Sequence, residues 1–346
     1  MNHHPRRQSA PSAELSSESA HKDGLHSRKQ LFHGLSRIDL GGGGAFLSGA
    51  GRGRGQRRLR KLRLLLNQSG IAHEIIVSES EAHLCELTRS LAQQRELIVA
   101  AGGDSTFHLM ANEIVRAGSQ AALGLIGLGS SNDIPREFGL TPFDRCLSAL
   151  QKGQVRKIDL AAIVYEGQVV RHVLGQVNIG LGVAVNEFVA SLSSRQPIYG
   201  RWQSLAGLLG IIHAFRHRLN SVNLSIQTEK ARYQGTFAVA VFSNLRFWAT
   251  GCLIAPSATP DDGRFDLFLL QTGSLLSLLR VAYLAKKGKH IEDKMVARAS
   301  ASSFVVSSSQ KFRLQADGEI VKLAGQPLEL DHFELRVIPG GLKIIA

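Results

Sequence analysis

Two glycine-rich turns carry the residues of this chain that are best suited to bind an anion. In Leu97–Asn112, an apolar, β-branched run ends at Gly102–Asp104 and continues with the residue spacing of a helix. The first N–H groups of a helix have no intrahelical partners and lie at the positive end of the helix dipole. This turn therefore predicts a phosphate site. Ser105 and Thr106 follow as residues that either cap the helix or contact the phosphate.

The second turn, Gly127–Asp133, has the sequence GLGSSND and overlaps the end of the apolar run Leu123–Leu128. In a parallel sheet, the carboxyl ends of neighbouring strands meet at one edge, and ligands bind there. We expect both turns at that edge, around one nucleotide-phosphate site. Asp104 can hold Mg²⁺ there, because Mg²⁺ prefers oxygen ligands, or it can orient a hydroxyl group.

The elements that position these turns follow from the pattern of apolar residues. Strands and helices alternate up to residue 158, which is typical of a parallel sheet covered on both faces. The expected strands in this part are 73–77, 97–101 and 123–128, and the expected helices are 56–67, 82–93, 107–116 and 143–152. Residues 1–40 are polar and predict a disordered tail, so the nucleotide-binding domain is expected over 41–158.

After Asp159 the periodicity changes to that of strands. Two-residue alternation and hairpin spacing predict a mainly antiparallel sandwich or barrel over 159–346, with the last residues returning to the first domain. The expected strands are 161–165, 168–175, 222–228, 235–243, 266–270, 303–308 and 312–316. Two apolar helices, 205–215 and 275–285, end in basic residues. They are either core helices or a surface that contacts lipid.

The net charge of +13 predicts anionic partners. Many of the basic residues lie between Arg52 and Arg63, as expected for a solvated helix face or for contact with an anionic membrane. No aromatic residues are interleaved with them, so we expect no nucleic-acid partner. No apolar run is long enough to span a bilayer, and three scattered cysteines do not form a metal-binding pattern. We expect a cytoplasmic protein that can bind the inner face of a membrane. A homodimer is also possible.

Three further stretches accompany the first turn in a fixed order, and the set resembles the diacylglycerol kinase catalytic-domain family. They are GLGSSNDIPREFGL (Gly127–Leu140), IAPSATPDDGRFDL (Ile254–Leu267) and QADGEIV (Gln315–Val321). The family includes sphingosine kinases, ceramide kinases and bacterial lipid kinases, with NAD kinases as distant relatives. The resemblance implies an NAD kinase-like α/β domain with a mostly parallel sheet, followed by a mainly antiparallel β-sandwich domain. It also implies ATP and Mg²⁺ as cofactors and a lipid as acceptor.

The resemblance implies roles for individual residues as well. The nucleotide-binding residues are expected to be Gly102, Gly103, Asp104, Ser105, Thr106, Ser78, Ser130, Asn132 and Asp133. A structural Mg²⁺ is expected at Asp262 and at the flanking carbonyls of Thr259 and Arg264. The catalytic residues are expected to be Glu319, Asp317 and Asp104, with a carboxylate of the DGE motif as the base on the acceptor hydroxyl. Asp262-Gly263 and Asp317-Gly318 are also ordinary hairpin sequences, so a purely structural role stays open for both.

Several residues depart from the family pattern. Ser105 and Ser131 replace glycines, and His108 and Leu109 stand where Asn-Glu is usual. If the family glycine at Ser105 has a positive φ, the serine would be strained by on the order of 1–2 kcal/mol. These departures affect the expected nucleotide affinity and acceptor more than the expected fold.

We therefore hypothesise an ATP- and Mg²⁺-dependent kinase that phosphorylates a diacylglycerol- or sphingosine-like lipid. Two alternatives remain open from the sequence. The first is a kinase of a soluble hydroxyl compound. The second is a nucleotide or lipid sensor without catalysis, which the substitutions at Ser105, His108 and Leu109 motivate.

Overall fold

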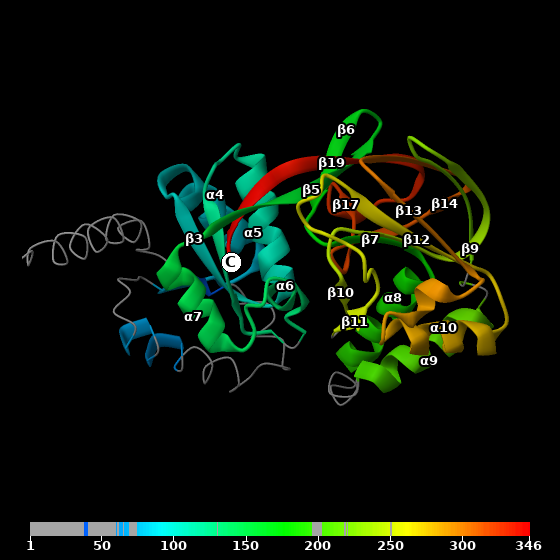
Figure 1. The fold of residues 1–346 in the computed structure, drawn as a ribbon, viewed down its shortest axis with the longest axis horizontal. Helices are drawn as coiled ribbons and strands as arrows, with labels where there is room; N and C mark the ends of the chain where they lie inside the picture. The colour runs from blue at the N-terminus through cyan, green and yellow to red at the C-terminus, as the bar shows by residue number, and fades with distance from the viewer. Residues whose placement is uncertain are drawn as a thin grey trace, which may run out of the picture.

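The chain forms two lobes that are joined by two long strands (Figure 1). This computed structural model describes residues 38–40, 60, 62–64, 66–68, 75–129, 131–195, 203–217, 219, 221–249 and 251–346. Most of the predicted tail 1–40, most of the basic run 52–63 and part of the predicted helix 56–67 lie outside the described residues, as does Ser130.

The first lobe is a parallel sheet with helices packed against it. Its strands run in the order β2 (Ile75–Val77), β1 (Ile38–Leu40), β3 (Leu97–Gly102) and β4 (Ala122–Gly127). The helices of this lobe are α4 (Glu81–Gln94), α5 (Asp104–Arg116), α6 (Asp133–Glu137) and α7 (Phe143–Lys152). Every residue of β3 is buried, because a strand covered on both faces must be apolar throughout.

The second lobe is built from antiparallel strands. They are β5 (Val155–Tyr165), β6 (Gln168–Val173), β7 (Gln176–Gly180), β8 (Val222–Gln227), β9 (Arg232–Ser243), β12 (Phe265–Gln271), β13 (Val296–Ala301), β14 (Ser303–Phe312), β15 (Leu314–Ala316), β16 (Glu319–Ile320) and β19 (Leu330–Ile345). Two short hairpins add β10 (Phe247–Trp248) with β11 (Cys252–Leu253), and β17 (Lys322–Leu323) with β18 (Gln326–Pro327). The core contains Phe242, which packs edge-on against Phe304 and Phe333.

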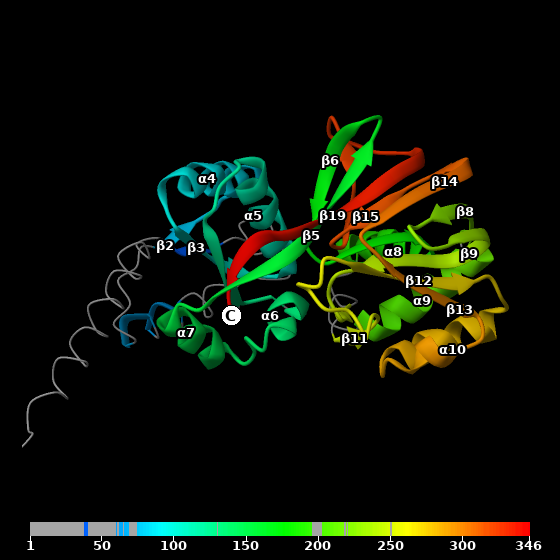
Figure 2. The ribbon, with the colours of Figure 1, turned by 45° about the horizontal axis from the view of Figure 1, so that its top comes forward.

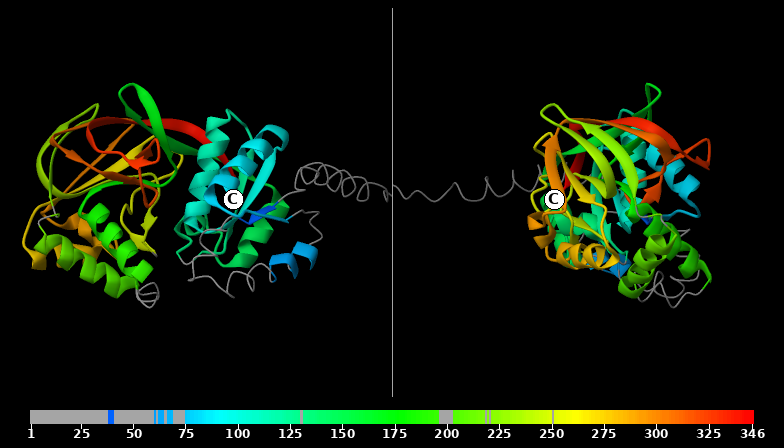
Figure 3. Two further views of the ribbon diagram at one scale, coloured as in Figure 1. Left: turned by 180° about the vertical axis from the view of Figure 1, so that it is seen from behind. Right: turned by 90° about the vertical axis from the view of Figure 1, so that its right-hand side faces the viewer.

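Helices cover one side of this second lobe. They are α8 (Leu181–Arg195), α9 (Gln203–Arg216), α10 (Leu275–Ala285) and the 3-10 helix η2 (Lys289–Glu292). Figures 1 and 3 show α8, α9 and α10 together on the same side of the β-sandwich, away from the tip of the β5–β6 hairpin. A separate apolar cluster fills the space between these helices and the strands, with Phe268 and Leu278 among its members.

Strands β5 and β19 connect the lobes, and Figure 2 shows them running side by side from one lobe to the other. They pair antiparallel from Glu334↔Val164 to Ile345↔Val155. The pairing shifts between Ile338 and Leu342, and the last residues of β19 pair parallel to β4. The C-terminal strand therefore belongs to the sheets of both lobes.

The predicted fold class is confirmed, with an α/β domain followed by an antiparallel β-sandwich. The predicted helices 143–152 and 275–285 have the observed bounds. Neither β7 nor α8 was predicted: the predicted strand 168–175 covers β6 and ends before β7, because the glycines at 175, 180 and 182 obscured both patterns.

Asp159 is the buried carboxylate that holds the connecting strands together. Its Oδ2 accepts a hydrogen bond of 2.6 Å from the Gly263 backbone N–H, and its Oδ1 accepts one of 2.8 Å from the Gly340 N–H. Its own N–H donates to the Pro260 carbonyl at 2.7 Å. One residue thus fixes β5, the turn before β12 and the bend in β19 relative to each other.

We predict that Asp159→Ala lowers the free energy of unfolding by about 3 kcal/mol, because it leaves two N–H groups without their acceptor. Calorimetric unfolding measures the effect. The matched control is Asp261→Ala, which removes an exposed carboxylate paired with Arg156 at 2.9 Å. That change should cost no more than about 1 kcal/mol. Equal stabilities of the two variants would contradict the assignment.

Candidate active site

The two glycine-rich turns lie against each other at the carboxyl edge of the parallel sheet. The N–H groups of Leu128 and Gly129 donate to the Gly102 carbonyl at 2.7 and 3.1 Å. A Cβ atom on Gly129 would lie only 2.6 Å from the Cα of Gly103. The glycines are therefore required because the two backbones touch, and they bring both predicted phosphate-binding segments to one place.

Asp104 joins the two turns by capping the helix that follows the second one. Its Oδ2 accepts from the Asp133 N–H at 3.2 Å, and its Oδ1 accepts from the Ile134 N–H at 3.0 Å. Burial raises the pKa of this carboxyl group, and the two backbone hydrogen bonds partly oppose that effect. Both oxygens are thus engaged with backbone, so the geometry favours a structural role for Asp104 over direct coordination of Mg²⁺.

Helix α5 begins earlier than the sequence predicted, and this changes the interpretation of Ser105. The N-cap is Gly103, which has extended backbone and provides no side-chain cap; neither Ser105 nor Thr106 caps the helix. Ser105 is exposed and is absent from the residues with positive φ, so the strain considered for this serine does not occur. Thr106 is buried. Because no described side chain caps α5, its N-terminal N–H groups form a cradle that fits a phosphate.

The remaining nucleotide-site candidates lie around the same edge. Asn132 has a left-handed backbone with φ of 52°, and its side chain makes two hydrogen bonds to Gly129, at 2.9 and 3.1 Å. Asp133 is the buried first residue of α6. Ser78 is also buried and directly follows β2, whose carboxyl end lies at this edge. Ser130 lies outside the described residues.

Asp317 supports the turn of the DGE motif from a distant segment. Its Oδ1 accepts from the N–H groups of Gly175 and Gln176 at 2.6 and 3.0 Å, and its Oδ2 accepts from Leu174 at 2.9 Å. Asp317 itself has a positive φ of 51°. Both carboxylate oxygens of Asp317 are occupied by backbone N–H groups, so this geometry assigns Asp317 to the shape of the turn.

Glu319, in contrast, faces the first lobe. Its Oε1 lies 3.2 Å from Nε2 of His108, which is fully buried on α5, and its Oε2 lies 3.3 Å from an Arg171 guanidinium nitrogen on β6. Burial raises the pKa of Glu319, but the short contact with His108 and the charge of Arg171 outweigh it and leave the pKa below its usual value. His108 is one helical turn beyond Asp104, so an ionised carboxylate from the second lobe lies beside the phosphate cradle.

The predicted metal turn has one carboxylate that fits a divalent cation. Asp262 accepts through Oδ1 from the Arg264 N–H at 3.0 Å. Burial and the neighbouring carboxylates of Asp266 and Asp159 raise the pKa of Asp262, and a cation would relieve this repulsion. The side chain of Arg264 points instead to Ser300 and Glu229, so only its carbonyl remains as a candidate. Thr259 is exposed. Among the described residues, no three His, Cys, Asp or Glu side chains come together as a metal cluster.

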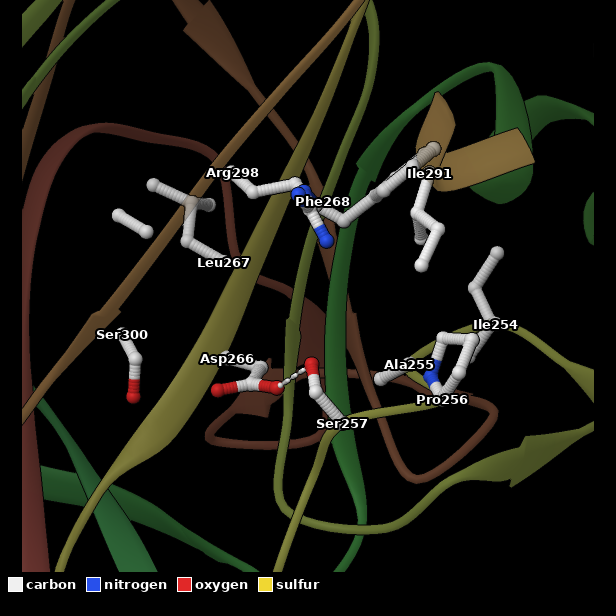
Figure 4. Close-up of a pocket in the computed structure, with 11 residues that line it drawn as sticks. Ile254, Ala255, Pro256, Ser257, Asp266, Leu267, Phe268, Ile291, Arg298 and Ser300 are labelled. Carbon is white, nitrogen blue, oxygen red and sulfur yellow. Dashed lines mark hydrogen bonds between the residues drawn. The ribbon is translucent and has the colours of Figure 1, made fainter. Parts of the chain in front are cut away.

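A pocket of about 420 Å³ lies on the helix side of strands β12 and β13 (Figure 4). Phe268 and Arg298 line it, and Asp266 accepts a 2.7 Å hydrogen bond from Ser257 at one end. All of its lining residues belong to the second lobe, and neither glycine-rich turn contributes to it. It is therefore separate from the phosphate cradle.

Four residues that connect the lobes were not predicted from the sequence as part of this site. Asp159 marked only the domain boundary, although a single acid within an apolar run was a usable signal. Arg171 and the pair formed by Glu137 and Arg246 had no sequence signal. The buried Glu137 accepts from the Arg246 N–H at 2.8 Å and from its Nε at 2.7 Å, which ties α6 to the second lobe.

The candidate anion cradle of the α/β lobe and Glu319 of the β-sandwich lobe are thus linked through His108, and phosphoryl transfer uses groups that hold phosphate together with a residue that orients the nucleophile. Residues 48–163 match the family profile described as the diacylglycerol kinase catalytic domain. Residues 175–346 match the profile described as the YegS C-terminal NAD kinase beta sandwich-like domain. Together the two matches cover most of the chain, and they identify residues 48–163 as a domain of the diacylglycerol kinase catalytic-domain family, a phosphotransferase domain with an alcohol group as acceptor.

Individual relatives agree with this assignment. The diacylglycerol kinase of Bacillus subtilis (strain 168) is 27% identical over 229 residues, which cover 65% of this chain and 71% of the relative. That of Staphylococcus saprophyticus is 28% identical over 257 residues, which cover 72% and 79%. A crystal structure from Bacillus anthracis str. Sterne has a TM-score of 0.69 at 18% identity, covering 90% of this chain and 97% of that one. This last similarity shows the fold alone.

We predict that Gly129→Ala lowers the free energy of unfolding by about 1–3 kcal/mol, because the new methyl group would meet backbone that cannot move aside. It should also weaken the binding of tripolyphosphate, which isothermal titration measures. The control is Gly207→Ala on α9, where a Cβ meets nothing within 4 Å. That variant should be neutral or slightly more stable. A Gly129→Ala protein with unchanged stability and anion affinity would contradict the geometry described above.

Proposed function

We propose that this protein is an ATP- and Mg²⁺-dependent kinase that transfers the γ-phosphate to a hydroxyl group of a lipid. The observation that carries the proposal is the contact of Glu319 with His108, which lies one helical turn from the uncapped N-terminus of α5. A carboxylate next to a phosphate cradle is what phosphoryl transfer requires, since the reaction depends on positioning and on charge stabilisation.

Different residues of the chain bind the phosphates, activate the acceptor and hold the site in shape. Backbone N–H groups of Gly103–Ser105 at the start of α5 hold the phosphate chain, and Glu319 orients the acceptor hydroxyl and takes its proton. Asp104 and Asp317 keep these segments in place through their backbone hydrogen bonds. Mg²⁺ would neutralise phosphate charge, and a separate structural Mg²⁺ would be held at Asp262.

A diacylglycerol-like acceptor is the first choice, because the named relatives are diacylglycerol kinases. A sphingosine-like amino alcohol is the second. The exposed surface of the second lobe agrees with a lipid acceptor. On α10, Leu276 is 80% exposed and Tyr283 is 62% exposed, and a separation of seven residues places both on one face of the helix.

Basic residues flank this apolar face. Lys286, Lys287 and Lys289 follow α10, and the Lys287 ammonium group lies 5.9 Å from the centre of the Tyr283 ring. Apolar side chains beside lysines favour binding to an anionic membrane surface. Within the described part of the chain, no helix combines the length and the apolar character needed to cross a bilayer. We infer that the protein reaches its acceptor from the cytoplasmic surface of the membrane.

The proposed function predicts transfer of ³²P from ATP to diacylglycerol in mixed micelles with Mg²⁺. Glu319→Gln should lower kcat by roughly 10²–10⁴-fold, because it removes the base and keeps the shape of the side chain. The control is Glu329→Gln, an exposed glutamate near Arg313. Transfer to sphingosine alone, or to soluble alcohols alone, would show that the acceptor is not diacylglycerol. Nucleotide binding without transfer to any acceptor would favour a sensor.

The membrane surface predicts that Leu276→Ser combined with Tyr283→Ser reduces sedimentation with phosphatidylglycerol vesicles. The double variant should lose roughly 2–4 kcal/mol of binding free energy and keep its thermal stability, because both side chains are exposed. Leu323→Ser on β17, where the leucine is 50% exposed, is the control. Equal sedimentation of all three proteins would rule out α10 as the contact.

A further inference from the structure

His108 is a fully buried histidine between an arginine and a glutamate of the other lobe. Nδ1 of His108 lies 2.9 Å from an Arg171 guanidinium nitrogen, and Nε2 lies 3.2 Å from Oε1 of Glu319. The same arginine nitrogen lies 3.3 Å from Oε2 of Glu319. Each of the three side chains therefore contacts the other two. Oε1 of Glu319 lies next to a nitrogen of His108, and Oε2 lies next to a nitrogen of Arg171.

The chemistry of arginine fixes the tautomer of this histidine. A guanidinium group only donates hydrogen bonds, so Nδ1 of His108 must accept the one from Arg171. The ring proton then resides on Nε2, which faces Glu319. A second proton on Nδ1 would point at the guanidinium group and would remove the acceptor. The Nε2–H group of His108 therefore lies on the side of the Glu319 carboxylate, 3.2 Å from Oε1.

Asn112 sets the distance between the two partners of Glu319. Its Nδ2 donates to the carbonyls of His108 and His172 at 2.9 and 3.0 Å, and its Oδ1 accepts from the His172 N–H at 3.0 Å. Asn112 is buried. It therefore links α5 to β6, and the spacing between His108 and Arg171 does not depend on Glu319.

We propose that His108 and Arg171 are positioning residues that hold Glu319 ionised and fix the direction of its carboxylate toward the acceptor hydroxyl. The inference rests on the proposed kinase function and adds to it how the base is prepared. Nε2 of His108 already carries a proton, so the histidine does not receive the proton of the acceptor. That proton goes to the Glu319 carboxylate as the hydroxyl oxygen forms its bond to phosphorus and the bond to the ADP oxygen breaks.

The ionisable groups around Glu319 come from three elements. His108 on α5 and Arg171 on β6 contact it, and both lower its pKa against the effect of burial. Asp317 lies on the same turn, but its oxygens are occupied by backbone N–H groups. The balance depends on the two nitrogen partners, so the loss of either one should raise the pKa of Glu319.

The experiment compares His108→Leu, which removes the N–H group, with His108→Gln, whose amide can still donate to Glu319. The pH dependence of kcat/KM for phosphoryl transfer to diacylglycerol is the readout. In His108→Leu the acidic limb should move to higher pH, and kcat should fall about tenfold or more, as for a lost hydrogen bond to a charged group. His108→Gln should restore the wild-type profile. Superimposable profiles for wild type and His108→Leu would overturn the proposal.

Two additions keep the outcome clear if His108→Leu folds poorly or if the acceptor is wrong. Arg171→Met, at a partly exposed position, should shift the acidic limb in the same direction, while His290→Leu, a buried histidine in the second lobe, should not. The carboxyl carbon of Glu319 can also be titrated by NMR in ¹³C-glutamate protein, with Glu319→Gln to assign the signal. An upward shift in His108→Leu without any kinase activity would uphold the positioning and refute only the proposed function. No shift would refute the positioning.

Discussion

Buried carboxylates that accept hydrogen bonds from backbone N–H groups of other segments hold this molecule in its working shape. Asp104 caps α6, Asp159 binds the turn before β12 and the bend of β19, and Asp317 binds the segment before β7. Each bond satisfies an N–H group that would otherwise be buried without a partner, which would cost about 1–3 kcal/mol. Because the donors and acceptors lie far apart in the sequence, these three aspartates fix how the turns and the two lobes meet.

Glu319 differs from those aspartates, since its partners are side chains rather than backbone. His108 and Arg171 leave it partly exposed and ionised beside the cradle formed by the first glycine-rich turn. Among the carboxylates of the four motifs, it is the one that combines a position at the lobe boundary with a favourable ionisation state. The three aspartates thus shape the site, whereas Glu319 is suited to act as the base.

The sequence was informative wherever a local pattern decides the structure. Continuous apolar runs predicted β3 and β4, and helical spacing predicted α7 and α10 with their observed bounds. The glycines of both turns were predicted as phosphate-binding residues, and the backbone contact between Gly103 and Gly129 is a further reason for glycine that the sequence did not indicate. The partners of the acids could not be predicted, because Arg171 lies 148 residues from Glu319 and no local rule specifies that contact. For the same reason Asp104 and Asp317 resembled catalytic residues in the sequence, whereas their oxygens are taken by backbone.

We expect the phosphate chain of a nucleotide to bind at the N-terminus of α5, beside the two glycine-rich turns, with its terminal phosphate directed at Glu319. A crystal structure of the protein with Mg²⁺ and a non-hydrolysable ATP analogue would show this binding mode. Phosphate oxygens should lie against the backbone N–H groups of Gly103–Ser105, with the γ-phosphate on the side of Glu319. A triphosphate bound elsewhere, for example at Arg298 in the second-lobe pocket, or a γ-phosphate directed away from Glu319, would contradict it.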